Sequence, residues 1–216
     1  MLRRFEIYSF DGPEEAIEDF VEAARDCARF IPEVLHSAIG RFSGSTALNF
    51  AWEQAYASPD TDRRYMKHPF HAARLDRYLM IDSPGCIATD NGLGVGLIGY
   101  SCDTPEYFLK KGARRVIGLQ LAHGASDEFA RIAAEERGRG GMVLSVFKEN
   151  TFGARWFDGE TVIDPAPMYS HVWEQGFDSL GIAQDYGEPW RERAAGVIEA
   201  VVDVVYELEP GYDYYA

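Results

Sequence analysis

The tripeptide Trp-Glu-Gln occurs twice in this chain, at Trp52–Gln54 and again at Trp173–Gln175. The two copies are 121 residues apart (173 − 52), and Tyr65 and Tyr186 share that offset. A repeat of this length is the signature of a chain built from two copies of one structural unit. We therefore expect 216 residues to form two related units, a first repeat over 1–102 and a second, diverged repeat over 113–210.

Hydrophobic periodicity predicts the same order of elements, β-α-β-β-α-β, in each unit. In the first unit, strands are expected at 4–10, 34–41, 47–57 and 86–101, and helical segments start near Pro13 and over 61–78. In the second unit, strands are expected at 115–121, 142–149, 169–177 and 202–208, and helices at 126–137 and 184–201. The fold class is therefore α+β. A sheet with both helices on one face must cover its other face, so we expect the two sheets to pack on each other within one chain.

Composition narrows the function and the compartment. The formal net charge is −14, and such a surface repels the phosphate backbone of nucleic acids. No stretch approaches the ~20 apolar residues of a membrane helix, and Glu6 interrupts any signal-peptide core. Three scattered cysteines, Cys27, Cys86 and Cys102, are typical of a reducing compartment. We expect a cytoplasmic protein that binds neither nucleic acid nor membrane.

The segment Tyr65-Met66-Lys67-His68-Pro69-Phe70-His71 places two of the five histidines and a tyrosine within seven residues. With the predicted order of elements, this segment resembles the dimeric α+β barrel family, also called the stress-responsive A/B barrel family. The resemblance implies two ferredoxin-like units that form an intramolecular dimeric α+β barrel. Within the family, the segment is similar to that of polyketide cyclases of the olivetolic acid cyclase kind.

That similarity implies chemistry at two positions. His71 would be a general base, because the ordinary pKa of histidine lies near neutral, and Tyr65 would donate a hydrogen bond to a carbonyl or enolate oxygen. The cyclases have a histidine in the first strand where this chain has Arg4, which could hold a substrate carboxylate. His68, Trp52 and Tyr56 would complete the pocket. The implied function is that of a cofactor-free cyclase or lyase acting on a small apolar or aromatic carbonyl compound.

Other interpretations of the same segment stay open. Pro69 can start a helix with His68 at its cap, and His71 can simply bond a backbone carbonyl. His68 and His71 are spaced for a metal ion on a helix, but no third ligand stands out. The second copy has Pro189 and Glu192 at the matching positions, so any histidine-dependent site would occur once per chain. The alternative function is a non-catalytic, stress-responsive or small-ligand-binding protein, and two chains could still associate as a homodimer of pseudo-dimers.

Three further patterns give expectations. Trp52, Tyr56, Trp173 and Phe177 lie at alternating strand positions, and we expect them in the contact between the sheets or lining a pocket. Glu53 and Glu174 should then face the helices and require partners such as Arg63 or Arg193. Gly94–Gly99 matches a dinucleotide-binding fingerprint by its letters, but no helix opens after it. The acidic, tyrosine-rich tail over 209–216 is either a frayed end or a strap.

Overall fold

The computed structural model describes residues 1–41, 49–80, 83–88, 96–102, 111–151, 156–158, 161–163 and 169–213. The predicted turn at Ser43–Ser45, the start of the Gly94–Gly99 motif and most of the linker at 103–112 lie outside these residues. The chain divides into two compact units. One comprises Met1–Leu97, Ser101–Glu106 and Leu208–Ala216, and the other comprises Ile98–Tyr100 and Tyr107–Glu207.

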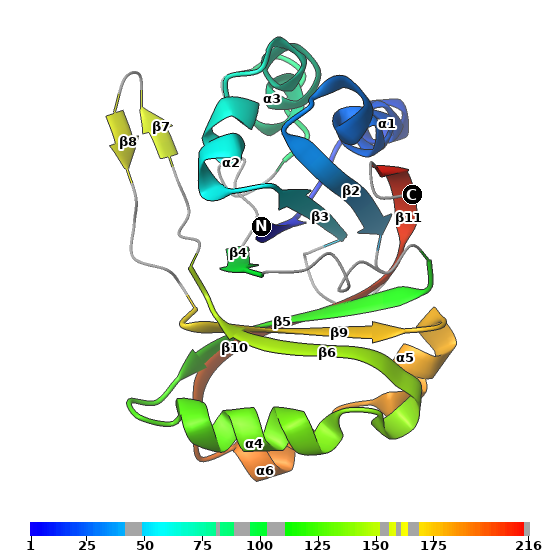
Figure 1. Ribbon diagram of the computed structural model, residues 1–216. Coiled ribbons are helices and arrows are strands. Elements are labelled where there is room, and N and C mark those ends of the chain that lie inside the picture. The colour runs from blue at the N-terminus through cyan, green and yellow to red at the C-terminus, as the bar shows by residue number, and fades with distance from the viewer. Residues whose placement is uncertain are drawn as a thin grey trace. The chain divides into compact units, whose positions relative to one another are not determined.

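The first unit has the predicted order of elements, and its helices lie on one face of its sheet (Figure 1). The sheet order is β11-β2-β3-β1-β4. The strands are β1 (Leu2–Tyr8), β2 (Val34–Arg41), β3 (Phe50–Tyr56), β4 (Gly96–Ser101) and β11 (Glu209–Asp213). The central strand β3 is antiparallel to both β1 and β2, which places the Trp-Glu-Gln copy in the middle of the sheet.

Helix α1 (Glu14–Phe30) follows directly from its sequence. Its buried residues recur at helical spacing: Ile17, Phe20, Ala23, Ala24, Cys27 and Ala28. Such a stripe forms an apolar face that packs on a sheet. Glu14 and Glu15 occupy the first turn, where negative charge is favoured by the helix dipole. The chain leaves the helix at Ile31, whose backbone is extended, one residue before Pro32.

The second helical region of this unit is broken rather than continuous. Helix α2 (Pro59–Tyr65) begins with a capping box in which Ser58 and Thr61 satisfy each other's backbone amides, and this arrangement fixes helix starts. A turn follows, and then a π-helix, η1 (His71–Leu75), runs into α3 (Asp76–Leu79). Pro69 accounts for the break, because proline has no amide hydrogen to continue a helical ladder.

The second unit repeats this plan with a four-stranded sheet in the order β10-β5-β9-β6. Its strands are β5 (Ala113–Leu121), β6 (Met142–Glu149), β9 (His171–Phe177) and β10 (Ile198–Glu207). Helices α4 (Ser126–Glu136), α5 (Leu180–Tyr186) and α6 (Trp190–Ala194) accompany the sheet, with a 3-10 turn, η4, at Arg139–Gly141. Figure 1 shows α4 and α6 on one face of this sheet. β7 (Trp156–Asp158) and β8 (Thr161–Ile163) pair antiparallel as a small two-stranded sheet.

The prediction of one helix over 184–201 is wrong. Helix α5 ends at Gly187, whose φ is +60°, a conformation that residues with a side chain rarely adopt. Helix α6 is short, and β10 already begins at Ile198. The run Val201–Val205 is rich in β-branched residues, which favour strands over helices. The single predicted helix therefore combined the end of α5, all of α6 and the start of β10.

The tail is a strand. β11 pairs antiparallel with β2 through Glu209↔Ile39 and Pro210↔Ala38, so the last described residues of the chain form the edge of the first sheet. Of the two alternatives for the tail, the structure shows an ordered segment over 209–213. Among the described residues, no helix is long and apolar enough to cross a membrane.

Candidate active site

The repeated tryptophans hold the same place in both units. Trp52 Nε1 donates to Ser37 Oγ at 2.9 Å, and Trp173 Nε1 donates to Ser145 Oγ at 3.0 Å. In each case, the serine lies on the strand next to the tryptophan's own. Both indole rings are fully buried. The sequence repeat therefore corresponds to a repeated three-dimensional contact within each unit.

These tryptophans face the helices. Trp52 packs edge-on against Phe20 of α1, with ring centroids 5.8 Å apart, and against Tyr65 of α2 at 6.5 Å. Trp173 contacts Phe129 of α4 in the same way at 5.6 Å. The expectation that these rings form the contact between two sheets is wrong, because alternation shows which side chains share a face but not which face the helices cover.

The glutamates of the repeat lie on the opposite face of their strands and are also fully buried. Glu53 pairs with Arg3 at 3.3 Å and with His36 Nε2 at 2.8 Å, and Glu174 pairs with Arg114 at 2.7 Å. The expectation of helix-side partners is therefore wrong. Those candidates make other ion pairs: Arg63 with Asp60, and Arg193 with Glu135 and Glu136.

Arg4 is the centre of a buried polar cluster between β1, β3 and α2. Its Nη1 donates to Asp62 Oδ1 at 2.7 Å, and its Nη2 donates to Gln54 Oε1 at 2.5 Å. It also forms an ion pair with Glu6, two residues along the same strand. Arg4 is 3% exposed, Glu6 8% and Asp62 1%. A guanidinium buried this deeply requires such partners, since desolvation would otherwise dominate.

The rings of two tyrosines, which also contact each other, lie beside this guanidinium. Its central carbon lies 5.3 Å from the ring centroid of Tyr56 and 5.1 Å from that of Tyr65, within the range of cation–π attraction. Both tyrosine hydroxyls are buried, and neither has a hydrogen-bond partner with an oxygen or nitrogen among the described residues. The Cys27 thiol, a weak partner, interacts with Tyr65. Burial raises the pKa of both tyrosines, so both stay protonated and able to donate.

His71 joins this cluster at the first residue of the π-helix. Its ring packs edge-on against Tyr65, with centroids 4.5 Å apart, and it is 3% exposed. His71 Nδ1 lies 3.2 Å from Asp76 Oδ1, close enough for an ion pair but not directed for a hydrogen bond. Short π-helical segments occur frequently at functional sites. The predicted pair His71 and Tyr65 is therefore in contact.

His68 is separate from the cluster. It is half-buried, and its Nδ1 accepts a hydrogen bond from the backbone amide of Phe70 at 3.2 Å. This is the capping position that the sequence offered as one interpretation. The described residues contain no group of three or more His, Cys, Asp or Glu side chains placed to share a metal ion.

The sequence analysis missed three members of the cluster, Glu6, Asp62 and Gln54. The pKa of Glu6 is raised, chiefly by burial and against the opposing charges of Arg4 and His71. A signal for two of them was present. Arg4 and Glu6 share a face of one strand by alternation, and Gln54 lies directly opposite Arg4 in the register. Asp62 could not be found this way, because its contact depends on how α2 packs.

The second unit has a related cluster whose hydrogen bonds and ion pairs are different. Arg115 lies opposite Gln175, as Arg4 lies opposite Gln54, but it pairs with Asp203 through two bonds of 2.7 and 2.6 Å. Arg115 and Arg191 both contact Asp203 and Glu188, so two cations face two anions.

The tyrosines that share the 121-residue offset also differ between the units. Tyr186 packs on Phe177 at 5.6 Å much as Tyr65 packs on Tyr56 at 5.4 Å. The Tyr186 hydroxyl, however, donates to Glu136 Oε2 at 2.7 Å. The same framework thus satisfies its tyrosine hydroxyl in the second unit, whereas in the first it leaves two without a nitrogen or oxygen partner among the described residues.

This difference predicts unequal effects of removing the two hydroxyls. Tyr186→Phe should lower the free energy of unfolding by about 1–3 kcal/mol, because the buried Glu136 carboxylate loses the hydrogen bond that the Tyr186 hydroxyl donates to it. Tyr65→Phe should change it by less than about 0.5 kcal/mol, because no strong hydrogen bond is lost. Urea denaturation of both variants checks this. An equal loss in both would mean that Tyr65 has a structural partner.

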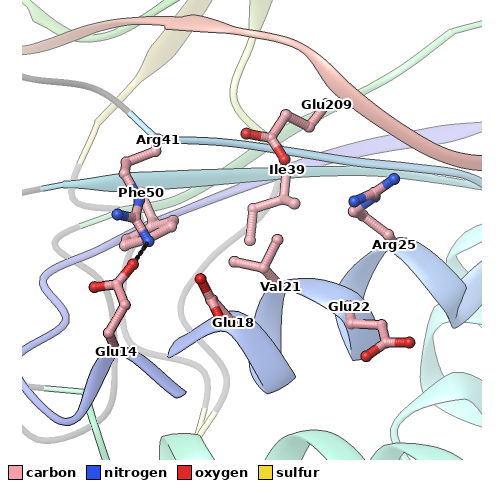
Figure 2. A pocket seen from close by; sticks show the side chains of 9 residues that line it. All are labelled: Glu14, Glu18, Val21, Glu22, Arg25, Ile39, Arg41, Phe50 and Glu209. Carbon is pink, nitrogen blue, oxygen red and sulfur yellow. Dashed lines mark hydrogen bonds and ion pairs between the residues drawn. The ribbon is translucent and has the colours of Figure 1, made fainter. Parts of the chain in front are cut away.

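A separate groove lies between α1 and β2 and has a volume of about 420 Å³ (Figure 2). Figure 2 shows Glu14, Glu18 and Glu22 along α1 on one side, and Ile39 and Arg41 of β2 on the other. Arg41 pairs with Glu14 at 2.7 Å across it. None of the predicted site residues lines this groove.

Comparison with known proteins rests on structure. The chain matches no family profile and no curated protein sequence. Among solved structures, it is similar to a candidate monooxygenase from Fusobacterium nucleatum subsp. nucleatum, with a TM-score of 0.61, 10% identity, and coverage of 99% of this chain and 96% of that one. An anthrone oxidase-like protein has a TM-score of 0.59 and 12% identity, with 99% and 94% covered. A variant chlorite dismutase from Candidatus Nitrospira defluvii has a TM-score of 0.59 and 10% identity, with 97% and 91% covered.

At these identities the comparisons show the fold alone. They agree with the order of elements and the antiparallel sheets described above. The chain therefore shares its fold with proteins of the ferredoxin-like, dimeric α+β barrel type.

Proposed function

We propose that this protein is a small-molecule enzyme that moves a proton next to a carbonyl group, at the Arg4 cluster of the first unit. The observation that carries the proposal is the pair of buried tyrosine hydroxyls at Tyr56 and Tyr65 that lack a nitrogen or oxygen partner among the described residues. Buried polar atoms are nearly always hydrogen-bonded. Groups that a fold leaves unsatisfied beside a histidine are candidates for binding a reacting molecule.

Each residue has a role in this proposal. His71, in its neutral form, removes a proton from the carbon next to the carbonyl. The negative charge that develops on the carbonyl oxygen is stabilised by the protonated Tyr65 and Tyr56 hydroxyls. Arg4 does not touch the substrate; it orients both tyrosine rings, which it contacts. The resulting enolate could be used by a cyclase or lyase.

Two of the similar structures support an enzyme that acts on small molecules. One is named as a candidate monooxygenase and the other as anthrone oxidase-like. The second unit supports one site per chain, because Tyr186 already bonds Glu136 and the chain has no histidine between Gly176 and Ala216.

Another similar structure is a heme-binding protein from Thermus thermophilus. Three of the five histidines are held by contacts with neighbouring side chains. His171 engages Ser126 and Ser170 with its two ring nitrogens, and His36 Nε2 bonds Glu53. His71 packs against Tyr65 with its Nδ1 towards Asp76. No step of the proposal uses a heme.

A second candidate function is ligand binding without chemistry. The groove between α1 and β2 favours it, because this volume has apolar side chains and charges of both signs and does not include His71. The two functions separate in one experiment. Ligands of the groove should respond to changes at Glu18 or Glu22, whereas substrates of the proposed enzyme should respond to changes at His71.

The test is deuterium exchange at the carbon next to a carbonyl, which requires only the first step. A panel of small aryl ketones, including 2′,4′-dihydroxyacetophenone, is incubated with the protein in D₂O and followed by proton NMR. The intact protein should accelerate exchange, and His71→Ala should lose about 10²–10⁴-fold of that acceleration. Tyr186→Phe serves as the matched control and should keep it. Full acceleration in the His71→Ala protein would refute the proposal.

A further inference from the structure

Asp76 lies beside the proposed base because of the π-helix. The backbone amide of Asp76 donates to the carbonyl of His71, which is the i→i+5 bond of a π-helix. In an α-helix of 3.6 residues per turn, side chains five residues apart would point about 140° away from each other. The wider π-helical turn brings the fifth residue back to the same side, and Asp76 Oδ1 lies 3.2 Å from His71 Nδ1. The irregular segment therefore joins these two side chains.

Contacts with α1 hold the π-helix in place. Arg74, near its end, donates to Asp19 of α1 at 3.0 Å, and Arg77 forms a second ion pair with Asp19. Leu75 is fully buried. The two cations nearest to Asp76 in the sequence are thus engaged by α1, and the Asp76 carboxylate faces a histidine instead.

The surroundings of His71 Nδ1 favour a proton on that nitrogen. A neutral imidazole has one N–H donor and one acceptor nitrogen. An unprotonated Nδ1 would direct its lone pair at the carboxylate of Asp76, whereas an N–H there could donate to it. Nδ1 is buried and makes no well-directed hydrogen bond among the described residues, but the Asp76 side chain is 34% exposed and has room to rotate towards it. Catalytic hydrogen bonds are often poorly aligned until a substrate binds.

We infer that Asp76 is a positioning residue that keeps the proton of neutral His71 on Nδ1 and so leaves Nε2 as the basic nitrogen. The inference rests on the proposed function for the role of His71 and adds a residue to that site. In the proposed step, Nε2 takes the proton from the carbon next to the carbonyl, and the electrons of the broken C–H bond pass to the enolate. The Asp76 carboxylate stabilises the imidazolium that results and does not contact the substrate.

Glu6 is the competing partner. Its pKa is raised by burial and lowered in part by the charges of Arg4 and His71, so its carboxyl group is also near the histidine. Glu6 forms an ion pair with Arg4. Within the described part of the chain, the carboxyl group at ion-pair distance from the His71 ring is that of Asp76. Separate variants of the two acids therefore show which one holds the ring.

The position of the ring proton tests the inference without turnover. In protein labelled with ¹⁵N-histidine, long-range proton–nitrogen correlation spectra at about pH 8, where an ordinary histidine is neutral, show which ring nitrogen carries the proton. The His71 signals are those that disappear in His71→Ala. The intact protein should show a protonated Nδ1 and an unprotonated Nε2. Asp76→Asn, whose amide can donate to Nδ1, should move the proton to Nε2.

Exchange of the ketone protons measures the consequence for the reaction. With 2′,4′-dihydroxyacetophenone in D₂O, Asp76→Asn should lose at least about 10²-fold of the acceleration, as expected when the base is held in the wrong tautomer. The loss should persist at saturating ketone, because Asp76 does not contact the substrate. Asp60→Asn is the matched control, because Asp60 is exposed and pairs with Arg63, and it should keep both the spectrum and the rate. If Asp76→Asn does not fold, Asp76→Ala removes the same acceptor and should also lose the Nδ1–H form.

The outcomes separate the inference from the proposed function. A proton on Nε2 in the intact protein would overturn the inference, as would an Nδ1–H form that survives in both Asp76 variants or is lost only in Glu6→Gln. If the spectra show the expected forms but no ketone exchanges faster, Asp76 still positions the ring and the proposed chemistry is removed. If His71→Ala loses the exchange activity and both Asp76 variants keep it, the chemistry stands and the role of Asp76 is wrong.

Discussion

Arg4→Met should unfold with a free energy about 3–5 kcal/mol lower than that of the intact protein at neutral pH, because removal of one partner leaves buried carboxyl groups without their counter-charge. The partners concerned are Glu6 and Asp62, both of which contact the guanidinium. Methionine fills much of the volume of the arginine stem. The loss of stability is therefore caused by removal of the positive charge rather than by a cavity. Urea denaturation of the two proteins measures it.

The loss should depend on pH in a defined direction. Burial raises the pKa of Glu6 above its ordinary value of 4.5, and Arg4 opposes this rise. Without Arg4, the folded-state pKa moves further up, so between pH 4.5 and that value the folded protein binds more protons than the unfolded one. Stability then falls as pH rises through this range and recovers as pH falls. The variant should therefore be closest to the intact protein at pH 4.5 and below.

A matched control is available at the surface. Arg41 forms an ion pair with Glu14, but both side chains are about half exposed, so Arg41→Met should cost no more than about 1 kcal/mol. If Arg4→Met were equally mild, the cluster carboxyl groups would have to be protonated in the native protein.

Trp52→Ala and Trp173→Ala should each lower the free energy of unfolding by about 3–5 kcal/mol, the usual cost of removing a large buried aromatic side chain. Both rings are fully buried, and each bonds a serine on the neighbouring strand. Denaturant unfolding measures the loss. Val143→Ala is the control, because Val143 is 53% exposed and should change stability by less than about 0.5 kcal/mol.

The similarity of the two losses is itself informative. The contacts around Trp52 and Trp173 match in partner type and distance, so the two costs should agree to within about 1 kcal/mol, given the spread seen for one kind of substitution. A negligible cost at Trp173 would contradict the interpretation of the second repeat as an equally packed unit.

The sequence predicted the framework better than the site. Alternation and the repeated Trp-Glu-Gln located the central strands β3 and β9 to within a few residues. Alternation cannot tell which face of a strand the helices cover, so Trp52 and Glu53 were placed on the wrong sides. The single helix predicted over 184–201 was wrong because Gly187 ends α5 and the β-branched run Val201–Val205 belongs to β10.

Of the contacts in the candidate site, the sequence predicted only the one between residues that are close together in the chain. Tyr65 and His71 lie six residues apart, and their contact follows from the short segment between them. Arg4 and Tyr56 were proposed individually. The pairing of Arg4 with Asp62, 58 residues apart, depends on the tertiary packing of α2, and no spacing in the sequence encodes it.

The C-terminal strand has a consequence for how such a chain could arise and be divided. β11 follows β10 of the second sheet along the chain but forms the edge of the first sheet beside β2. The first unit is therefore completed by residues that are translated after the second. A gene cut between the repeats would yield a first half with an open sheet edge at β2, the kind of edge that recruits other chains.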